Sequence, residues 1–489
     1  MFPPPASRPQ PSLSKADLWV VAVLALFTFV VRGAWFGDPN ADIDEQLYSL
    51  IGNAMLDGHV PFVDLWDRKP YGLFALFALA HAVGGPGPEA YQVMAAIFTL
   101  AGALMVFVLG RYQVDQMTAA AGGLLYIVLC TIYDVHSGNS EAFFIPMMVM
   151  MAILVVDPSH PNAVPRALAA MVVGGLALQI KYTVLPQCLF FGLWVLWGQY
   201  QRKMPLGRLV TFASACCMLG LLPTALVGAG YAAAGYWDEF VFANFISFFD
   251  RLPSPSGRFP RMFLVFMALL ATLALLGINA ARRDKSAGLP PTYVFVLLWT
   301  VASLASTFLP STLYRHYLAA MIPTCVLLSL PLFRSEGTAR INVPALLPAV
   351  LLMALVPMHY GLSHFNRIAT ERLASAIRPH VDGRDRCLLV FDGPTSLYRM
   401  TGSCLPTRYI FPDHLNNALE SNALGVRQDE EVARILAARP RVIVTADRPV
   451  TIQNSDSKRL IKAAIARDYR ELTHVTLHKR KVRAWILRE

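Results

Sequence analysis

Residues 18–36 read LWVVAVLALFTFVVRGAWF, an apolar run whose single charged residue is Arg32. A transmembrane helix needs roughly 20 mainly apolar residues, so this run is long enough to cross a bilayer. It lacks a small-residue cleavage site and therefore predicts a retained anchor rather than a removed signal peptide. Similar runs recur almost to residue 360 and predict eleven spans, at 18–36, 90–109, 118–134, 142–156, 166–180, 182–198, 209–234, 261–281, 292–309, 317–333 and 343–362.

The composition of the 489-residue chain agrees with a membrane protein, because 55% of its residues are hydrophobic and only 15% are charged. Soluble domains carry about 25% charged residues. A water-soluble globule, a disordered chain and a disulfide-dense secreted scaffold are therefore excluded. We expect a polytopic α-helical membrane domain over residues 18–362. The Pro-rich start predicts a disordered cytoplasmic tail over residues 1–17.

Positive charges indicate how the chain crosses the membrane. Lysines and arginines gather in alternate loops, namely Arg8, Lys15, Arg111, Arg202, Lys203, Arg208, Arg282, Arg283, Lys285, Arg334 and Arg340. Cytoplasmic loops carry such an excess, so the N-terminus is predicted to be cytoplasmic. Eleven spans then place residues 363–489 on the external side of the membrane.

Residues 363–489 have a different pattern, in which short apolar runs alternate with amphipathic segments. This pattern predicts a small α/β domain, with strands at 387–391, 408–411, 442–445, 472–477 and 482–487 and helices at 395–401, 429–438 and 457–467. The region holds 22 Lys and Arg against 14 Asp and Glu, a net charge of +8 that would favour an anionic surface. Cys387 and Cys404 are either a disulfide, which an oxidising compartment would preserve, or two buried thiols.

The predicted spans contain no acidic or basic residue apart from their ends, such as Arg32 and Arg166. Carriers and proton pumps normally hold such residues near the bilayer midplane. The charges gather instead in the external loops, which favours chemistry at the outer surface. Carriers of polar substrates without midplane charges exist, so a polytopic flippase or carrier for lipid-linked sugars stays an alternative. A sensor with an external binding domain is a third alternative.

The first external loop concentrates the acids. Asp42 or Asp44 precedes a helical pattern over 45–56 and can cap it, because helix N-termini expose unpaired N–H groups. Its apolar residues at helical spacing predict a helix lying in the membrane interface, and residues 71–83 predict a second one. Asp42, Asp44 and Glu45 are either a cap with solvated charges or a catalytic carboxylate cluster. A carboxylate facing Arg68 and Lys69 suits transfer from a phosphorylated donor, because the acid accepts a proton while the cation neutralises the leaving phosphate.

Three stretches of this loop carry a family resemblance: Asp44-Glu45-x-x-Tyr48, Gly58-x-x-Pro61-Phe-x-Asp64 and Asp67-Arg68-Lys69-Pro70. They resemble the first periplasmic loop of GT-C glycosyltransferases, in the bacterial branch related to protein O-mannosyltransferases and the aminoarabinose transferase of lipid A. The segments 136–141 and 314–317 and Lys181 resemble later family features more weakly. Two departures stand out. Tyr71 replaces the second proline of a common Lys-Pro-Pro, and Asn139 and Glu141 stand where many relatives have Asp.

The resemblance implies a polyprenyl-phosphate-linked sugar donor and an inverting transfer at the outer leaflet. The expected partners are this donor, a lipid, glycan or protein acceptor, and membrane lipids, with no nucleic acid. No nucleotide-binding motif is present. A transferase of the same fold that uses another lipid-linked group is the runner-up. No metal ligands are predicted, and participation of a divalent ion is left open.

The predicted roles follow from residue type and position. Asp44 is the expected general base, followed by Glu45 and Asp42. The donor phosphate is expected to contact Lys69, Arg68, Lys181 and Arg315. The acceptor or the sugar is expected to contact Tyr48, Asp67, Glu141 and His316. Structural alternatives are an interfacial lysine at position 69, simple interfacial anchoring for Lys181 and Arg315, a helix-start acid at Glu141 and a belt residue at His316.

Overall fold

The computed structural model describes residues 15–253, 261–283, 290–310, 312–334 and 343–489. The chain forms two compact units. Unit 1 comprises Met1–Ala34, Val93–Val227 and Ser256–Pro357, and unit 2 comprises Trp35–Gln92, Gly228–Pro255 and Met358–Glu489. This division joins the segment predicted as the first external loop to the C-terminal region, whereas the sequence predicts a contiguous boundary near residue 362.

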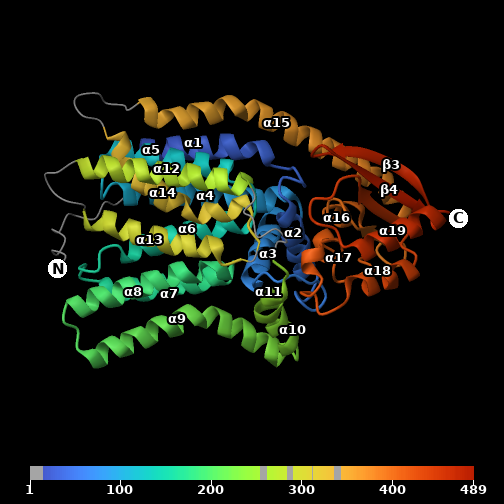
Figure 1. Ribbon diagram of the computed structural model, residues 1–489, viewed down its shortest axis with the longest axis horizontal. Coiled ribbons are helices and arrows are strands. Elements are labelled where there is room, and N and C mark those ends of the chain that lie inside the picture. Colours follow the sequence, from blue (N-terminus) through green and yellow to red (C-terminus); the bar gives the residue numbers. More distant parts are fainter. Residues whose placement is uncertain (1–14, 254–260, 284–289, 311, 335–342) are drawn as a thin grey trace. The chain divides into compact units, whose positions relative to one another are not determined.

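Unit 1 is helical, and a helix forms at each of the runs predicted as spans (Figure 1). Its helices are α1 (Leu18–Arg32), α4 (Pro88–Gly110), α5 (Gln116–Ile132), α6 (Ser140–Val155), α7 (Ala163–Leu178), α8 (Leu185–Gln201), α9 (Leu206–Ala233), α12 (Arg261–Arg283), α13 (Pro291–Phe308) and α14 (Ile322–Ser329). Helix α15 (Val343–Ile377) lies partly in unit 1 and partly in unit 2, as do the first residues of α4 and the last residues of α9. The described helices include seven that are long and apolar enough to cross a membrane. The protein is a multi-pass membrane protein, and the count of eleven spans stays a prediction.

Close helix packing supports unit 1. Helix α12 meets α14 at Gly277, where an added Cβ would clash with the backbone of Leu328 and Ser329. At the N-terminal end, Lys15–Asp17 forms a 3-10 turn whose buried Asp17 accepts hydrogen bonds from Arg111 (3.0 Å) and Gln116 (2.8 Å). The predicted disorder is therefore wrong at residues 15–17, because a buried carboxylate is paired there. The rest of that predicted tail lies outside the described residues, as do Lys285 and Arg340.

Unit 2 contains the two helices expected in the first loop, α2 (Ile43–Leu56) and α3 (Tyr71–Gly84), which pack on each other. It also contains α10 (Trp237–Val241) and α11 (Ser247–Asp250). Its strands β1 (Leu388–Val390), β2 (Val442–Ala446), β3 (Tyr469–Leu477) and β4 (Arg480–Leu487) form a sheet of order β1-β2-β4-β3. The β1–β2 pair is parallel and the others are antiparallel. Helices α16 (Leu397–Thr401), α17 (Pro412–Asn416), α18 (Gln428–Ala437) and α19 (Ser455–Asp468) complete the predicted α/β domain.

The first loop and the C-terminal region share one hydrophobic core. Trp66 is buried in a cluster with Tyr409, Leu389 and Ile443. The predicted strand at 408–411 is wrong. The Arg408 carbonyl accepts a hydrogen bond from the backbone N–H of Trp66 (3.0 Å), and no described residue of 408–411 joins the sheet. Residues 408–411 pair with the first loop instead, and local sequence patterns cannot indicate a partner so distant in sequence.

Cys387 and Cys404 form a disulfide, with their Cα atoms 4.8 Å apart. The disulfide alternative is thus confirmed over the pair of buried thiols. The bond ties the start of β1 to the segment that follows α16.

Candidate functional site

Asp42 is the N-cap of α2. Its carboxylate accepts hydrogen bonds from the backbone N–H groups of Asp44 (2.9 Å) and Glu45 (3.4 Å). A side-chain oxygen at this position satisfies helix donors that otherwise have no partner. The capping interpretation of Asp42 is therefore the one that its contacts support, and its effect is to hold Asp44 in the first turn.

Glu45 is buried, with no exposed surface, and points toward the start of α4. Its carboxylate accepts hydrogen bonds from the Tyr91 hydroxyl (3.3 Å) and the Gln92 amide (3.4 Å). A buried carboxylate needs such partners. Glu45 thus anchors α2, and this arrangement leaves it less accessible to a substrate than Asp44.

Asp44, Tyr48 and Lys69 meet beside the first turn of α2. The Asp44 carboxylate lies 3.8 Å from the Lys69 ammonium and accepts a hydrogen bond from the Tyr48 hydroxyl (3.2 Å). The Lys69 ammonium also lies 5.5 Å from the centre of the Tyr48 ring, within the range of a cation–π contact. The side chains of Asp44 and Lys69 are 35% and 20% exposed, so both charges can be reached by a ligand.

Asp67 is buried and interacts electrostatically with Lys69 and Asp44. Its carboxylate accepts a hydrogen bond from the Arg68 backbone N–H (2.7 Å). Burial raises the pKa of Asp67, and the positive charges of Lys69 and Arg68 oppose that rise. Its contacts shape the loop that carries Lys69.

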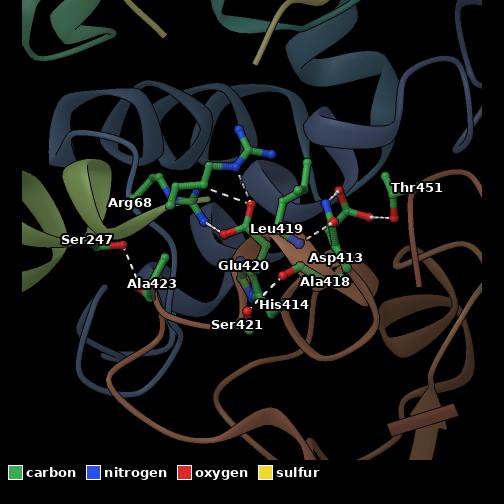
Figure 2. A network of polar contacts seen from close by, with 12 residues as sticks. Arg68, Ser247, Asp413, His414, Ala418, Leu419, Glu420, Ser421, Ala423 and Thr451 are labelled. Atoms are coloured by element: carbon green, nitrogen blue, oxygen red, sulfur yellow. Dashed lines mark hydrogen bonds and ion pairs between the residues drawn. The ribbon is translucent and has the colours of Figure 1, made fainter. Parts of the chain in front are cut away.

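Arg68 does not pair with the Asp67 carboxylate. Figure 2 shows its guanidinium against the Glu420 carboxylate, to which both terminal nitrogens donate, one of them over 3.1 Å. Arg251, after α11, lies 2.8 Å from the same carboxylate. The partner of Arg68 is thus a carboxylate of the C-terminal region, which is distant in sequence. Arg68, Arg251 and the buried Glu420 carboxylate therefore form an ion-pair network within unit 2.

Asp413, like Glu420, is an acidic residue that the sequence analysis did not single out. Its carboxylate accepts hydrogen bonds from Thr451 (3.3 Å, Figure 2) and Asn417 (3.3 Å). Burial, followed by the negative charges of Glu420 and Asp44, raises the pKa of Asp413 to about 6. Neighbouring His414 is buried against Trp66, and burial lowers its pKa well below the ordinary value. Neither residue lies in a motif, so no sequence signal connected either one to Asp44.

In unit 1, Glu141 and Lys181 form a buried ion pair. The Lys181 ammonium also lies 4.3 Å from the centre of the Tyr317 ring. Glu141 accepts a further hydrogen bond from Ser140 (2.9 Å). Both side chains are less than 10% exposed, so this pair is more enclosed than the Asp44–Lys69 pair.

Arg315, also in unit 1, donates two hydrogen bonds to Asp134, one of them over 2.6 Å. Asp134 has a left-handed backbone with φ of 62°, and the sequence analysis did not single it out. His316 stacks on Tyr314, with ring centres 5.6 Å apart. The predicted residues therefore fall into two groups. Asp42, Asp44, Glu45, Tyr48, Asp67, Arg68 and Lys69 lie in unit 2, and Glu141, Lys181, Arg315 and His316 lie in unit 1.

Within the described parts of the chain, no group of three or more His, Cys, Asp or Glu side chains could hold a metal ion. The acids around Asp44 are paired with lysine, arginine, hydroxyl and amide groups instead.

The chain has the fold of the GT-C membrane glycosyltransferases, as its first-loop motifs predicted. It is similar to ArnT from Cupriavidus metallidurans bound to undecaprenyl phosphate, with a TM-score of 0.62 and 15% identity over 97% of this chain and 98% of that one. The apo state of the same ArnT gives a TM-score of 0.63 and 14% identity, over 96% and 98% of the two chains. The apo oligosaccharyltransferase of Archaeoglobus fulgidus gives 0.51 and 12%, over 88% of this chain and 69% of that one. No protein-family model matches the sequence, and no curated protein matches it significantly.

Proposed function

We propose that the protein transfers a sugar from a polyprenyl-phosphate-linked donor to an acceptor hydroxyl on the outer side of the cytoplasmic membrane, with inversion at the anomeric carbon. One observation carries the proposal. A partly exposed carboxylate, Asp44, lies 3.8 Å from a partly exposed ammonium, Lys69. The fold adds support, since the similar ArnT structure is described as bound to undecaprenyl phosphate.

The chemistry is a single displacement. The acceptor oxygen forms a bond to the anomeric carbon while the bond from that carbon to the phosphate oxygen breaks. Asp44 accepts the proton of the acceptor hydroxyl, and Lys69 offsets the negative charge that develops on the departing polyprenyl phosphate. One base and one stabilised leaving group are sufficient, so the two-carboxylate machinery of a retaining glycosidase is not needed.

Tyr48 orients the base in this proposal, because its hydroxyl donates to the Asp44 carboxylate (3.2 Å). Asp67 positions the backbone that carries Lys69, through its bond to the Arg68 N–H (2.7 Å). Asp42 serves as the cap that holds Asp44, and Glu45 as the buried anchor of α2. Arg68 acts indirectly, since its guanidinium is paired with Glu420.

For unit 1 we propose that Lys181 and Arg315 contact the lipid phosphate. Both cations are paired with carboxylates, Glu141 and Asp134, which a phosphate would have to displace or share. Glu141 and His316 remain proposed contacts to the acceptor or sugar. The cytoplasmic N-terminus and periplasmic C-terminal region also belong to this proposal, supported by the distribution of basic residues among the loops.

A turnover assay tests the function. The purified full-length protein in nanodiscs is given a panel of polyprenyl-phosphate sugars and native membrane extract as acceptor, and released polyprenyl phosphate is measured. We expect Asp44→Asn to lower the rate by about 100-fold or more, because general-base catalysis contributes factors of that order. Asp57→Asn is the matched control, since it removes an exposed carboxylate at the other end of α2.

Equal rates for Asp44→Asn and wild type would reject Asp44 as the base. No release with any donor, together with movement of lipid-linked sugar across the bilayer, would reject the transferase and support the carrier alternative.

A further inference from the structure

The turn that joins β3 to β4 consists of His478 and Lys479, and both residues have a left-handed backbone. Leu477 pairs with Arg480 across the hairpin, so these two residues form the whole loop. Their φ angles are 47° and 61°. A two-residue loop with positive φ at both positions is a type I′ turn, which strongly prefers Asn and Gly. Histidine and lysine are therefore costly here, and backbone strain of this kind gathers at functional sites.

The His478 side chain contacts the segment that precedes α2. Its imidazole Nε2 lies 3.2 Å from the backbone carbonyl oxygen of Asn40. A carbonyl oxygen only accepts, so Nε2 carries the proton and donates this hydrogen bond. The other ring nitrogen, Nδ1, lies 3.5 Å from the side-chain nitrogen of Asn366, which only donates. Both contacts therefore suit the same neutral form of the ring.

Asn40 is held by several elements of the C-terminal region. Its side chain is buried, donates to the Thr370 hydroxyl of α15 and accepts from the Ser396 hydroxyl (3.3 Å), just before α16. Its backbone N–H donates to the Asp38 carboxylate (2.9 Å). With His478, three parts of the C-terminal region thus bind one residue of the first loop, and the hairpin turn supplies the bond to its backbone carbonyl.

The segment held in this way leads into the cap of α2. Asn40 lies two residues before Asp42, which is at most about 7 Å of chain. The Asp42 carboxylate accepts hydrogen bonds from the backbone N–H groups of Asp44 (2.9 Å) and Glu45 (3.4 Å). The Asp44 side chain reaches Lys69, at 3.8 Å, from this first turn. A shift of the Asn40 carbonyl is therefore passed through the cap to the candidate base.

We propose that His478 is a positioning residue for Asp44. The left-handed turn places the imidazole so that Nε2 holds the Asn40 carbonyl, and this bond keeps the cap of α2 in its place. The expected effect on turnover rests on the proposed sugar transfer. The expected effect on the first turn of α2 does not depend on that function.

In a competing explanation, the hairpin merely tolerates His478 and Lys479, and the contact with Asn40 has no consequence. Two substitutions separate the explanations. His478→Asn suits a type I′ turn, but its shorter amide corresponds to Nδ1 of the ring and leaves Nε2 without a replacement. Lys479→Gly suits the same turn and keeps the imidazole. Both variants should have melting temperatures at least as high as wild type, because each removes a costly left-handed residue.

Hydrogen–deuterium exchange of the full-length protein in nanodiscs tests the positioning role, with mass spectrometry of peptides covering residues 42–48. His478→Asn should speed exchange at the amides of Asp44 and Glu45 by about fivefold, since one hydrogen bond contributes a factor of that order. Lys479→Gly is the matched control and should exchange like wild type. His478→Gln places an amide nitrogen near the position of Nε2, so its exchange should return toward the wild-type rate.

The turnover assay provides a second measurement on the same variants. His478→Asn should lower kcat by about tenfold and leave KM for the donor unchanged, because a displaced base slows the chemical step while the phosphate contacts stay. Lys479→Gly should keep the wild-type kcat, and His478→Gln should recover much of the loss.

Equal exchange in wild type and His478→Asn would overturn the positioning role. Exchange in His478→Gln as fast as in His478→Asn would overturn it as well, since the donor at Nε2 would then not matter. Faster exchange with an unchanged kcat would overturn the link to Asp44. If wild type releases no polyprenyl phosphate, the proposed function fails, and the exchange comparison still decides the role of His478.

Discussion

Each unit of the molecule contains an acid–lysine pair from the candidate site, and the two pairs differ in their surroundings. Glu141 and Lys181, in unit 1, are 2% and 8% exposed, and the lysine also contacts the Tyr317 ring. Asp44 and Lys69, in unit 2, are 35% and 20% exposed and stand 3.8 Å apart. The residue types are nearly the same, whereas the access of solvent is not.

Because of this difference, one pair is expected to matter mainly for stability and the other mainly for chemistry. Removing one member of a buried pair leaves an uncompensated charge, which costs about 3–5 kcal/mol, whereas an exposed pair contributes about 1 kcal/mol or less. The Glu141–Lys181 pair therefore has a large structural consequence whatever its further role. The Asp44–Lys69 pair contributes little to stability and remains accessible to a substrate.

The largest effect on stability is expected for Glu141→Gln. The substitution leaves the Lys181 charge buried without its carboxylate, so the free energy of unfolding should fall by about 3 kcal/mol or more. Unfolding in detergent, followed by circular dichroism against denaturant, measures it. The double variant Glu141→Gln/Lys181→Met should recover much of the loss. Wild-type stability for the single variant would remove the distinction between the two pairs.

Lys69→Gln should have a large effect on activity and a small effect on stability. Transfer should slow by about 100-fold, because the charge on the leaving phosphate loses its counter-ion. The free energy of unfolding should change by about 1 kcal/mol or less, because the pair is partly exposed. Lys462→Gln, an exposed lysine of the same unit, is the control and should change neither quantity. A stability loss as large as that of Glu141→Gln would contradict the comparison.

The Arg68–Glu420–Arg251 network allows the effect of burial on ion pairs to be tested within unit 2 alone. The Glu420 side chain is 4% exposed and contacts both arginines. We expect Glu420→Gln to lower the free energy of unfolding by about 2 kcal/mol, since it weakens charge-assisted bonds to two enclosed guanidinium groups. Glu430→Gln breaks an exposed pair with Arg427 and should have an effect within about 0.5 kcal/mol. Equal effects of the two variants would show that burial does not decide the outcome here.

The smallest expected effect is a pH dependence due to Asp413. Its pKa in the folded protein is raised to about 6 from 3.8, so the folded state binds the proton more tightly than the unfolded chain. Its contribution to stability is therefore present below about pH 4 and lost as pH rises toward 6 and above. The difference in melting temperature, Asp413→Asn minus wild type, should increase by a few degrees between pH 4.5 and pH 7.

Asp385→Asn, at an exposed position, serves as the control for this pH series. A difference between Asp413→Asn and wild type that stays constant over the same pH range would reject the raised pKa.

Local patterns predicted much of this protein because they report local causes. Long apolar runs predict the helices of unit 1, since a helix satisfies its own backbone groups in an apolar environment. The Asp42 cap and the helix after it follow from the preference of acids for helix N-termini, and the spacing of Asp44 and Tyr48 places them on one face. The predicted strand at 408–411 failed because its partner is the Trp66 segment, far away in sequence.

By itself the sequence determined the helical membrane fold, the acid-rich first loop and the candidate residues Asp44 and Lys69, because apolar periodicity and short motifs are properties of neighbouring residues. Only the tertiary structure decided which charges are enclosed. It paired Arg68 with Glu420, Arg315 with Asp134 and Lys181 with Glu141. It also brought Asp413 into the electrostatic range of Asp44. Burial and long-range pairing depend on how distant segments pack, and no local pattern records that.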